Sequence, residues 1–122
     1  DEKDMVSEII GLPSNHYTPK LNIEFFRITL TDNNFNERLT IDTNLSVKNG
    51  ADSKIFDQLV ISEIKQNKYN PKSDFIKILR DLNIQEMRFS KYCMGVLHLN
   101  DNVKYNRFKP RLLQINKILS QT

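Results

Sequence analysis

The feature that most constrains the fold of this chain is a segment, 37–45, in which polar and apolar side chains alternate. Alternation with a period of two is typical of a half-buried β-strand, because successive side chains point to opposite faces. One face would carry Leu39, Ile41, Thr43 and Leu45. The other face would carry Arg38, Thr40, Asp42 and Asn44. A cation and an anion interleaved with hydrogen-bonding groups would suit the wall of a charged, water-filled cavity, although an ordinary surface strand is the more frequent explanation.

Two further segments are predicted to be strands. Residues 21–30 alternate between an apolar set and a set that contains Arg27. The turn-forming residues 32–34 join this segment to 38–45, which predicts an antiparallel hairpin with Arg27 and Arg38 on the same side. Residues 59–65 favour a third strand, and Glu63 and Lys65 would share one of its faces.

Helical patterns lie before and after these strands. Residues 2–10 have apolar residues at helical spacing and are followed by Gly11-Leu12-Pro13, which ends a helix. Ser73 is a suitable N-cap for a second helix. Residues 87–99 have helical or mixed character, and 111–119 favour a last amphipathic helix. The chain is therefore expected to form a single α+β domain over residues 1–122, with antiparallel strands packed against amphipathic helices.

Composition excludes several classes of function. The formal net charge is +3 and the pI is near 9.0, a mild excess that is compatible with an anionic partner. No apolar run is long enough to predict a membrane span. The single Cys93 excludes an internal disulfide and favours a reducing, cytoplasmic location. With three glycines there is no glycine-rich phosphate loop, and no motif of a hydrolytic triad occurs.

The basic residues are the best candidates for a binding site. Phosphate oxygens need several fixed cations and hydroxyl or amide donors. Arg27 and Arg38 come from neighbouring strands, and Arg88 and Lys91 would share a face if their segment is helical. For each of these residues taken alone, an ordinary place on the protein surface is the alternative interpretation. Glu63 would either hold a divalent cation beside bound phosphates or form a cross-strand ion pair.

Three blocks of this sequence together resemble the catalytic domain of the vacuolar transporter chaperone family. The blocks are Phe25-Phe26-Arg27 with the segment 37–45, then Glu63-Ile64-Lys65, then Arg88-Phe89-Ser90-Lys91-Tyr92 followed by Gly95. The resemblance runs over about residues 18–97. That domain is a polyphosphate polymerase and is similar to the triphosphate tunnel metalloenzymes, whose closed antiparallel barrel has charged residues pointing into its bore.

The resemblance implies a function and a set of site residues. Arg27, Arg38, Arg88, Ser90 and Lys91 would bind the phosphates of ATP and polyphosphate, and Glu63 would coordinate a divalent cation, Mn²⁺ or Mg²⁺. The parent protein would be a phosphotransferase that moves the γ-phosphoryl group of ATP to a polyphosphate chain. Such chemistry needs in-line positioning and charge neutralisation rather than a covalent nucleophile.

This chain also departs from the family's pattern. Phe25 stands where many members have Tyr, which removes one hydrogen bond, and the family's first strands have no counterpart here. The resemblance therefore covers the carboxy-terminal half of the domain. It implies a fragment of a partial barrel without full activity, or a homodimer that completes the barrel through open strand edges.

Two other functions stay open from the sequence alone. A triphosphate hydrolase could have the same fold, and a polyphosphate- or inositol-phosphate-binding module could have lost catalysis. Nucleic acid is disfavoured as a partner, because the aromatic residues lie in apolar contexts rather than as exposed stacking platforms.

Overall fold

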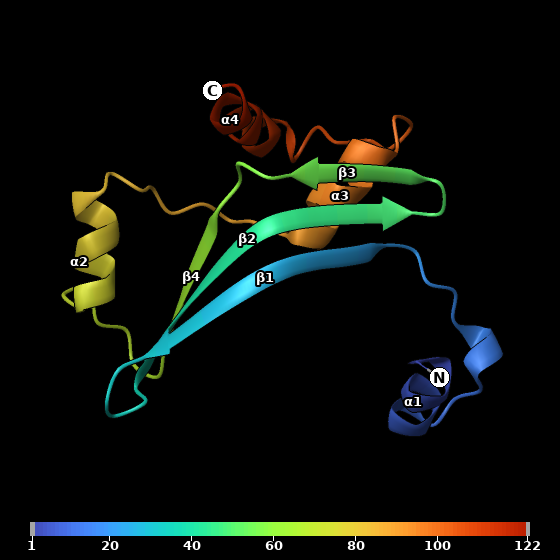
Figure 1. Cartoon of the computed structure of the whole chain (residues 1–122), viewed down its shortest axis with the longest axis horizontal. Helices are drawn as coiled ribbons and strands as arrows, with labels where there is room; N and C mark the ends of the chain where they lie inside the picture. Colours follow the sequence, from blue (N-terminus) through green and yellow to red (C-terminus); the bar gives the residue numbers. More distant parts are fainter. Residues whose placement is uncertain (1, 122) are drawn as a thin grey trace.

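The central element of the fold is a long strand, β2 (Glu37–Asn49), which has partners on both of its edges. This computed structural model describes residues 2–121. β1 (Asn22–Thr31) runs antiparallel along one edge of β2. β3 (Asp52–Phe56) and β4 (Ile61–Gln66) share the other edge, where β3 pairs with residues 45–49 and β4 with residues 37–42. The result is an open four-stranded antiparallel sheet (Figure 1), so the predicted α+β class and the predicted hairpin are confirmed.

The alternation of β2 changes phase at a β-bulge. Two residues of β2, Asn44 and Leu45, lie opposite Phe25 of β1. Asn44 has a φ of 53°, a left-handed conformation that Asn adopts more readily than most residues do. Because the bulge inserts one residue, Leu45 lies on the face of Asp42. The prediction that Leu45 shares a face with Leu39 is wrong, since strict alternation does not allow for an inserted residue.

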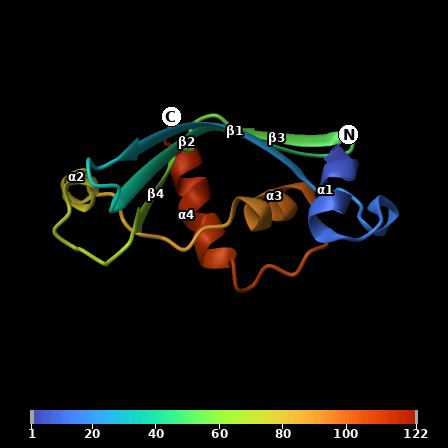
Figure 2. The same ribbon diagram turned by 90° about the horizontal axis from the view of Figure 1, so that it is seen from below.

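The hydrophobic core lies between the bulged half of the sheet and two helices, α3 (Lys91–Leu99) and α4 (Lys109–Leu119). Its buried members are Leu45, Val47, Phe56, Leu59, Met94 and Ile115. Gly95 allows α3 to approach the sheet closely, because a Cβ at this position would lie 3.0 Å from the side chain of Val47 in β2 and 2.7 Å from that of Leu21. Figure 2 shows the sheet arched over α3 and α4, while none of the described helices covers its opposite face.

The helix after Ser73 forms as predicted, whereas the helix in residues 87–99 is shorter. α2 spans Asp74–Asp81, and the Ser73 hydroxyl accepts a hydrogen bond from the Ile76 N–H at 3.2 Å. α3 begins only at Lys91, because Ser90 is its N-cap and accepts a hydrogen bond from the Cys93 N–H at 3.2 Å. Arg88 therefore lies in the loop before the helix, and helical spacing does not relate it to Lys91.

β3 is the one strand for which the sequence analysis made no prediction. The chain turns after β2 at Asn49-Gly50, where Gly50 has a φ of 60°. The chain then returns along β2, with Asp52 paired to Asn49. Its first residues are polar and exposed, and only Phe56 at its end is buried. A strand with one buried side chain has no alternation to detect.

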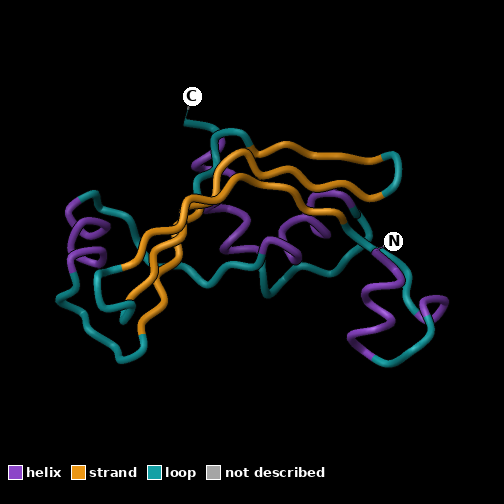
Figure 3. Tube along the Cα trace, turned by 60° about the horizontal axis from the view of Figure 1, so that its bottom comes forward, coloured by secondary structure: helices purple, strands orange, loops and turns teal. Residues whose placement is uncertain are grey.

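Two helices lie away from the core, at opposite ends of the bent sheet (Figure 3). These are α1 (Glu2–Ile10), which has the predicted bounds, and α2. Their apolar faces are largely exposed, as Ile9 of α1 is 76% exposed and Ile78 of α2 is 53% exposed. None of the helices among the described residues is long and apolar enough to cross a membrane.

Candidate functional site

One face of the sheet carries charged and hydroxyl side chains in three rows that run across the strands. Residues paired across antiparallel strands share a face, so the register defines the rows. The first row joins Arg27 and Asp42, the second Thr29, Thr40 and Glu63, and the third Thr31, Arg38 and Lys65. We call these eight residues the charged face.

The charged face brings together residues that are distant in the sequence. Arg27 and Arg38 lie on the same side of the hairpin, as predicted, and Glu63 and Lys65 share a face, as predicted. Lys65 and Glu63 form an exposed ion pair of 3.4 Å. Successive rows are about 7 Å apart, because each is two residues further along the strand. A linear anion that lies along the strands would therefore meet each row in turn.

The carboxylate of Asp42 binds two cations at once. Arg27 Nε donates to Asp42 Oδ1 at 2.6 Å and Arg27 Nη2 donates to Oδ2 at 2.8 Å. Lys91, the first residue of α3, places Nζ 2.6 Å from the same Oδ2. The side chain of Asp42 is 2% exposed, whereas those of Lys91 and Arg27 are 19% and 41% exposed. We call these three residues the Asp42 clamp. It fixes helix α3 to strands β1 and β2.

The two cations hold Asp42 in its ionised form. The hydrogen bond from Arg27, followed by the hydrogen bond and charge of Lys91, lowers the pKa of Asp42 to about 2 despite the opposing effect of burial. In return, the hydrogen bond to Asp42 raises the pKa of Arg27 above its ordinary value. Asp42 and Arg27 are therefore both charged at neutral pH.

The ring of Phe25 lies against both cations of the clamp. Its centroid is 5.0 Å from the Arg27 guanidinium carbon and 4.8 Å from Lys91 Nζ. Cations are attracted to the face of an aromatic ring at such distances. Phe25 is thus a packing surface for the two cations. It lies at the border between the hydrophobic core and the charged face.

Thr40 carries a buried hydroxyl without a hydrogen-bond partner in the described part of the chain. Its residue exposure is 6%, and Oγ1 has no hydrogen-bond partner among the described residues. In the second row it lies between Thr29 and Glu63. A buried polar atom without a partner is uncommon in a stable fold. This orphaned hydroxyl marks the middle of the charged face as a place where a polar contact is missing.

The remaining predicted site residues lie beside the clamp rather than on the charged face. Arg88 is exposed and lines a small cavity with Ser90 and Arg111. The Ser90 hydroxyl already accepts the capping hydrogen bond from α3, although it keeps its own proton to donate. Within residues 2–121, no described interaction joins Arg88 to the charged face.

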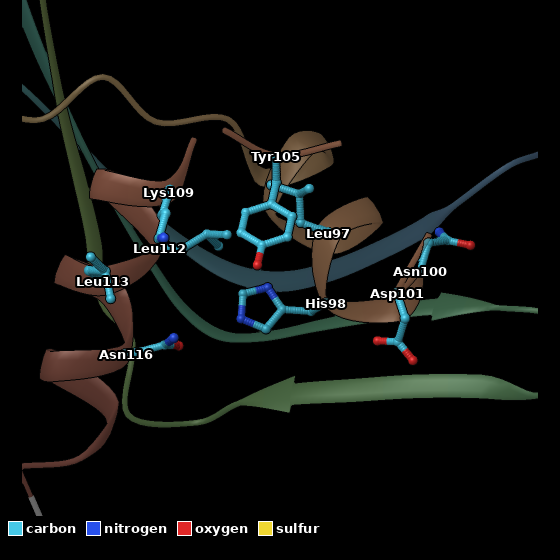
Figure 4. Close-up of a pocket in the computed structure, with 9 residues that line it drawn as sticks. All are labelled: Leu97, His98, Asn100, Asp101, Tyr105, Lys109, Leu112, Leu113 and Asn116. Carbon is cyan, nitrogen blue, oxygen red and sulfur yellow. The ribbon is translucent and has the colours of Figure 1, made fainter. Parts of the chain in front are cut away.

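A separate cavity of about 410 Å³ opens between α3 and α4. In Figure 4 the imidazole of His98 and the hydroxyl of Tyr105 point toward each other across it. His98 Nδ1 is 2.8 Å from the carbonyl oxygen of Met94, and its ring packs edge-on against Phe56. These two contacts make His98 a structural residue. The lining contains no residue of the charged face, so the two sites are independent.

Three functional candidates escaped the sequence analysis: Asp42, Thr40 and Phe25. Asp42 and Thr40 were assigned to a polar strand face, but no partner was assigned to either. The missing signal was the register of the hairpin, which pairs Arg27 with Asp42. Lys91 comes from a helix distant in the sequence, and nothing in the sequence pattern brings it to this carboxylate.

The family model described as the VTC domain matches residues 2–100. This range includes the charged face and the Asp42 clamp. No curated protein and no solved structure matches the chain.

Proposed function

The chain belongs to the VTC domain family, and on that premise we propose that it is part of an ATP- and metal-dependent polyphosphate polymerase domain. Membership of the family suggests a role that involves polyphosphate. The charged face would bind the phosphate chain, and Arg27, Arg38 and Lys91 would be its principal ligands. Arg88 and Ser90 would contribute further contacts where the chain passes the start of α3.

The observation that carries this proposal is the shared face of Arg27, Arg38 and Lys65, to which Lys91 is joined through Asp42. Four cations against two carboxylates leave the site positive, as a polyanion requires. Guanidinium groups match phosphate oxygens with paired donors, and lysines add point charges. The orphaned hydroxyl of Thr40 would gain a partner from a bound oxygen.

The proposed reaction transfers the γ-phosphoryl group of ATP to the end of a polyphosphate chain. The bond from the γ-phosphorus to the ADP oxygen breaks as a terminal oxygen of the chain forms a new bond to phosphorus. The residues of this site would hold donor and acceptor in line and neutralise the charge on the equatorial oxygens. No side chain needs to become covalently attached.

The carboxylate of Glu63 is suited to coordinate a divalent cation of the kind that accompanies bound phosphates. Mg²⁺ is commonly held by one or two carboxylates together with substrate phosphates. Among the described residues, no three His, Cys, Asp or Glu side chains are grouped to hold a metal ion, which leaves Glu63 as a single-carboxylate ligand. Its side chain is 50% exposed and lies in the middle row. The cation, Mn²⁺ or Mg²⁺, would neutralise phosphate charge and orient the oxygens.

We further propose that the open sheet is one wall of a tunnel-type barrel and that residues 1–122 are the carboxy-terminal part of that domain. The arch of the sheet over its charged face supports this arrangement (Figure 2). The outer edge of β1 has no strand partner among residues 2–121. It could pair with further strands of the same protein or with a second copy. We expect the domain to act in the cytoplasm, where ATP is abundant.

The first test measures polyphosphate binding by isothermal titration calorimetry. Arg38→Gln removes one cation from the third row. It is expected to lower the affinity by about tenfold to a hundredfold, which corresponds to one lost hydrogen-bonded charge pair. Arg80→Gln on α2 removes the same charge away from the charged face and should leave the affinity nearly unchanged. Equal losses of polyphosphate affinity in the two variants would mean that binding depends only on the net charge of the protein.

The second test identifies the reaction by its products. The full-length protein is incubated with ATP and Mn²⁺ or Mg²⁺, and long-chain polyphosphate is the expected product. Orthophosphate as the only product would indicate a triphosphate hydrolase, and tight polyphosphate binding without turnover would indicate a binding module. Glu63→Gln should abolish metal-dependent turnover. Unchanged turnover would contradict its role as the metal ligand.

A further inference from the structure

We propose that Asp42 is a positioning residue, which holds Arg27 and Lys91 as a preformed pair of phosphate ligands without contacting the phosphate itself. This role rests on the proposed function of the charged face. It is distinct from the role of the cations, because Asp42 carries the same charge as the ligand and would repel it.

Exposure separates the carboxylate from its two partners. Asp42 is 2% exposed and both of its oxygens are engaged by cations. Arg27 is 41% exposed, and its contact with Asp42 uses only two of the five N–H donors of a guanidinium. Lys91 likewise uses one of its three ammonium donors on Asp42. Among residues 2–121, no further hydrogen bond engages the remaining donors of these two cations, so they can bind phosphate oxygens.

Fixing these two side chains in advance saves entropy at the moment of binding. Arg and Lys are among the most flexible side chains, and immobilising each one costs free energy on association. In this protein each cation is held at two points, the carboxylate of Asp42 and the ring of Phe25. Without Asp42, the two positive groups would also repel each other and separate.

Positioning and net charge predict opposite effects for Asp42→Asn. The substitution keeps the shape of the side chain and adds one positive charge to the site. If Asp42 matters only through its charge, tripolyphosphate should bind more tightly to the variant. If Asp42 positions the cations, tripolyphosphate should bind about tenfold more weakly, because two side chains must then be ordered on binding.

The control adds the same charge on the other face of the sheet. Glu24 is on β1, is 59% exposed and lies 3.8 Å from Lys48 in a surface ion pair. It shares the face of Phe26 and so points away from the clamp. Glu24→Gln should leave tripolyphosphate affinity unchanged or slightly increased. The tripolyphosphate affinity of both variants is measured under conditions in which circular dichroism shows that each variant is fully folded.

A nuclear magnetic resonance measurement separates positioning from general loosening of the fold. In the wild type the Arg27 Nε–H is held in a hydrogen bond to Asp42, so it should exchange slowly with water. In Asp42→Asn this proton should lose protection, while the backbone amides of Leu45 and Val47 in the core keep theirs. Equal loss of protection at all of these sites would overturn the proposal in favour of a purely structural role.

The outcomes distinguish this inference from the proposed function. If the wild type does not bind tripolyphosphate, the proposed function fails and the role of Asp42 fails with it. If the wild type binds and Asp42→Asn binds equally or more tightly, only the positioning role is overturned. Should Asp42→Asn fail to fold, Asp42→Glu keeps the charge and displaces the carboxylate by one methylene. Weaker binding by that variant supports positioning, and wild-type affinity overturns it.

Discussion

At the scale of single residues, Asp42 makes the stability of this fold depend on pH. Its pKa is about 2 in the folded protein, below the ordinary value of 3.8. A depressed carboxyl pKa stabilises the fold above the unfolded pKa, and this stabilisation is lost as the pH falls through the folded pKa. The shift corresponds to about 2 kcal/mol at neutral pH. The contribution should therefore disappear between about pH 4 and pH 2.

This dependence is measured by comparing the wild type with Asp42→Asn in urea unfolding at a series of pH values. At pH 7 the variant should have a lower free energy of unfolding, by about 2 kcal/mol. The gap should narrow as the pH falls from 4 toward 2, because the wild type then loses its ionised carboxylate. A gap that is constant across the series would show that the effect of the substitution is steric rather than electrostatic.

The position of an individual residue was predictable only where alternation along a strand was enough to assign it to a face of the sheet. Arg27, Arg38 and Glu63 were assigned to faces by alternation and by turn chemistry, and the register bears this out. Lys91 was a candidate ligand because of its charge, and the resemblance strengthened that assignment. Its contact with Asp42 depends on how α3 packs on the sheet. That packing is fixed by the close approach at Gly95, which no local pattern encodes.

At the scale of elements, the bulge at Asn44 joins the two halves of β2. Before the bulge, Asp42 faces the clamp, and after it Leu45 and Val47 face the core. One inserted residue therefore puts a charged site and a hydrophobic core on the same face of one strand. Alternation predicted the strand itself but not this change of phase, because an inserted residue leaves no mark in composition.

Substitutions at Asn44 test the bulge. Asn44→Gly should leave the free energy of unfolding nearly unchanged, since glycine adopts the observed φ of 53° freely. Asn44→Val should lower it by about 1–2 kcal/mol, because a β-branched side chain is strained in that conformation. Thr43→Val, at the neighbouring position, is the control and should have a small effect. Similar effects of the two valine substitutions in thermal unfolding would argue against a strained site.

At the scale of the whole molecule, the helices cover one face of the sheet and leave apolar side chains exposed on the other. On β1, Phe26 is 73% exposed, Ile28 is 56% exposed and Leu30 is 44% exposed. These residues alternate with the charged-face residues of the same strand, and they border the edge that has no strand partner among the described residues. A long apolar edge strand without a partner is a site for pairing with another strand. Alternation in the sequence predicted this apolar stripe. Only the three-dimensional structure reveals that none of the described elements covers it.

Sedimentation equilibrium of this chain should therefore detect association that increases with concentration. Ile28→Lys places a charge in the middle of the stripe, which is a common way for natural edge strands to prevent pairing. The variant should remain monomeric at concentrations where the wild type associates. The control is Ile9→Lys, which makes the same substitution at an exposed isoleucine of α1, away from the sheet. This variant should associate like the wild type. If Ile9→Lys abolishes association and Ile28→Lys does not, the contact involves α1 and the edge of β1 is free in solution.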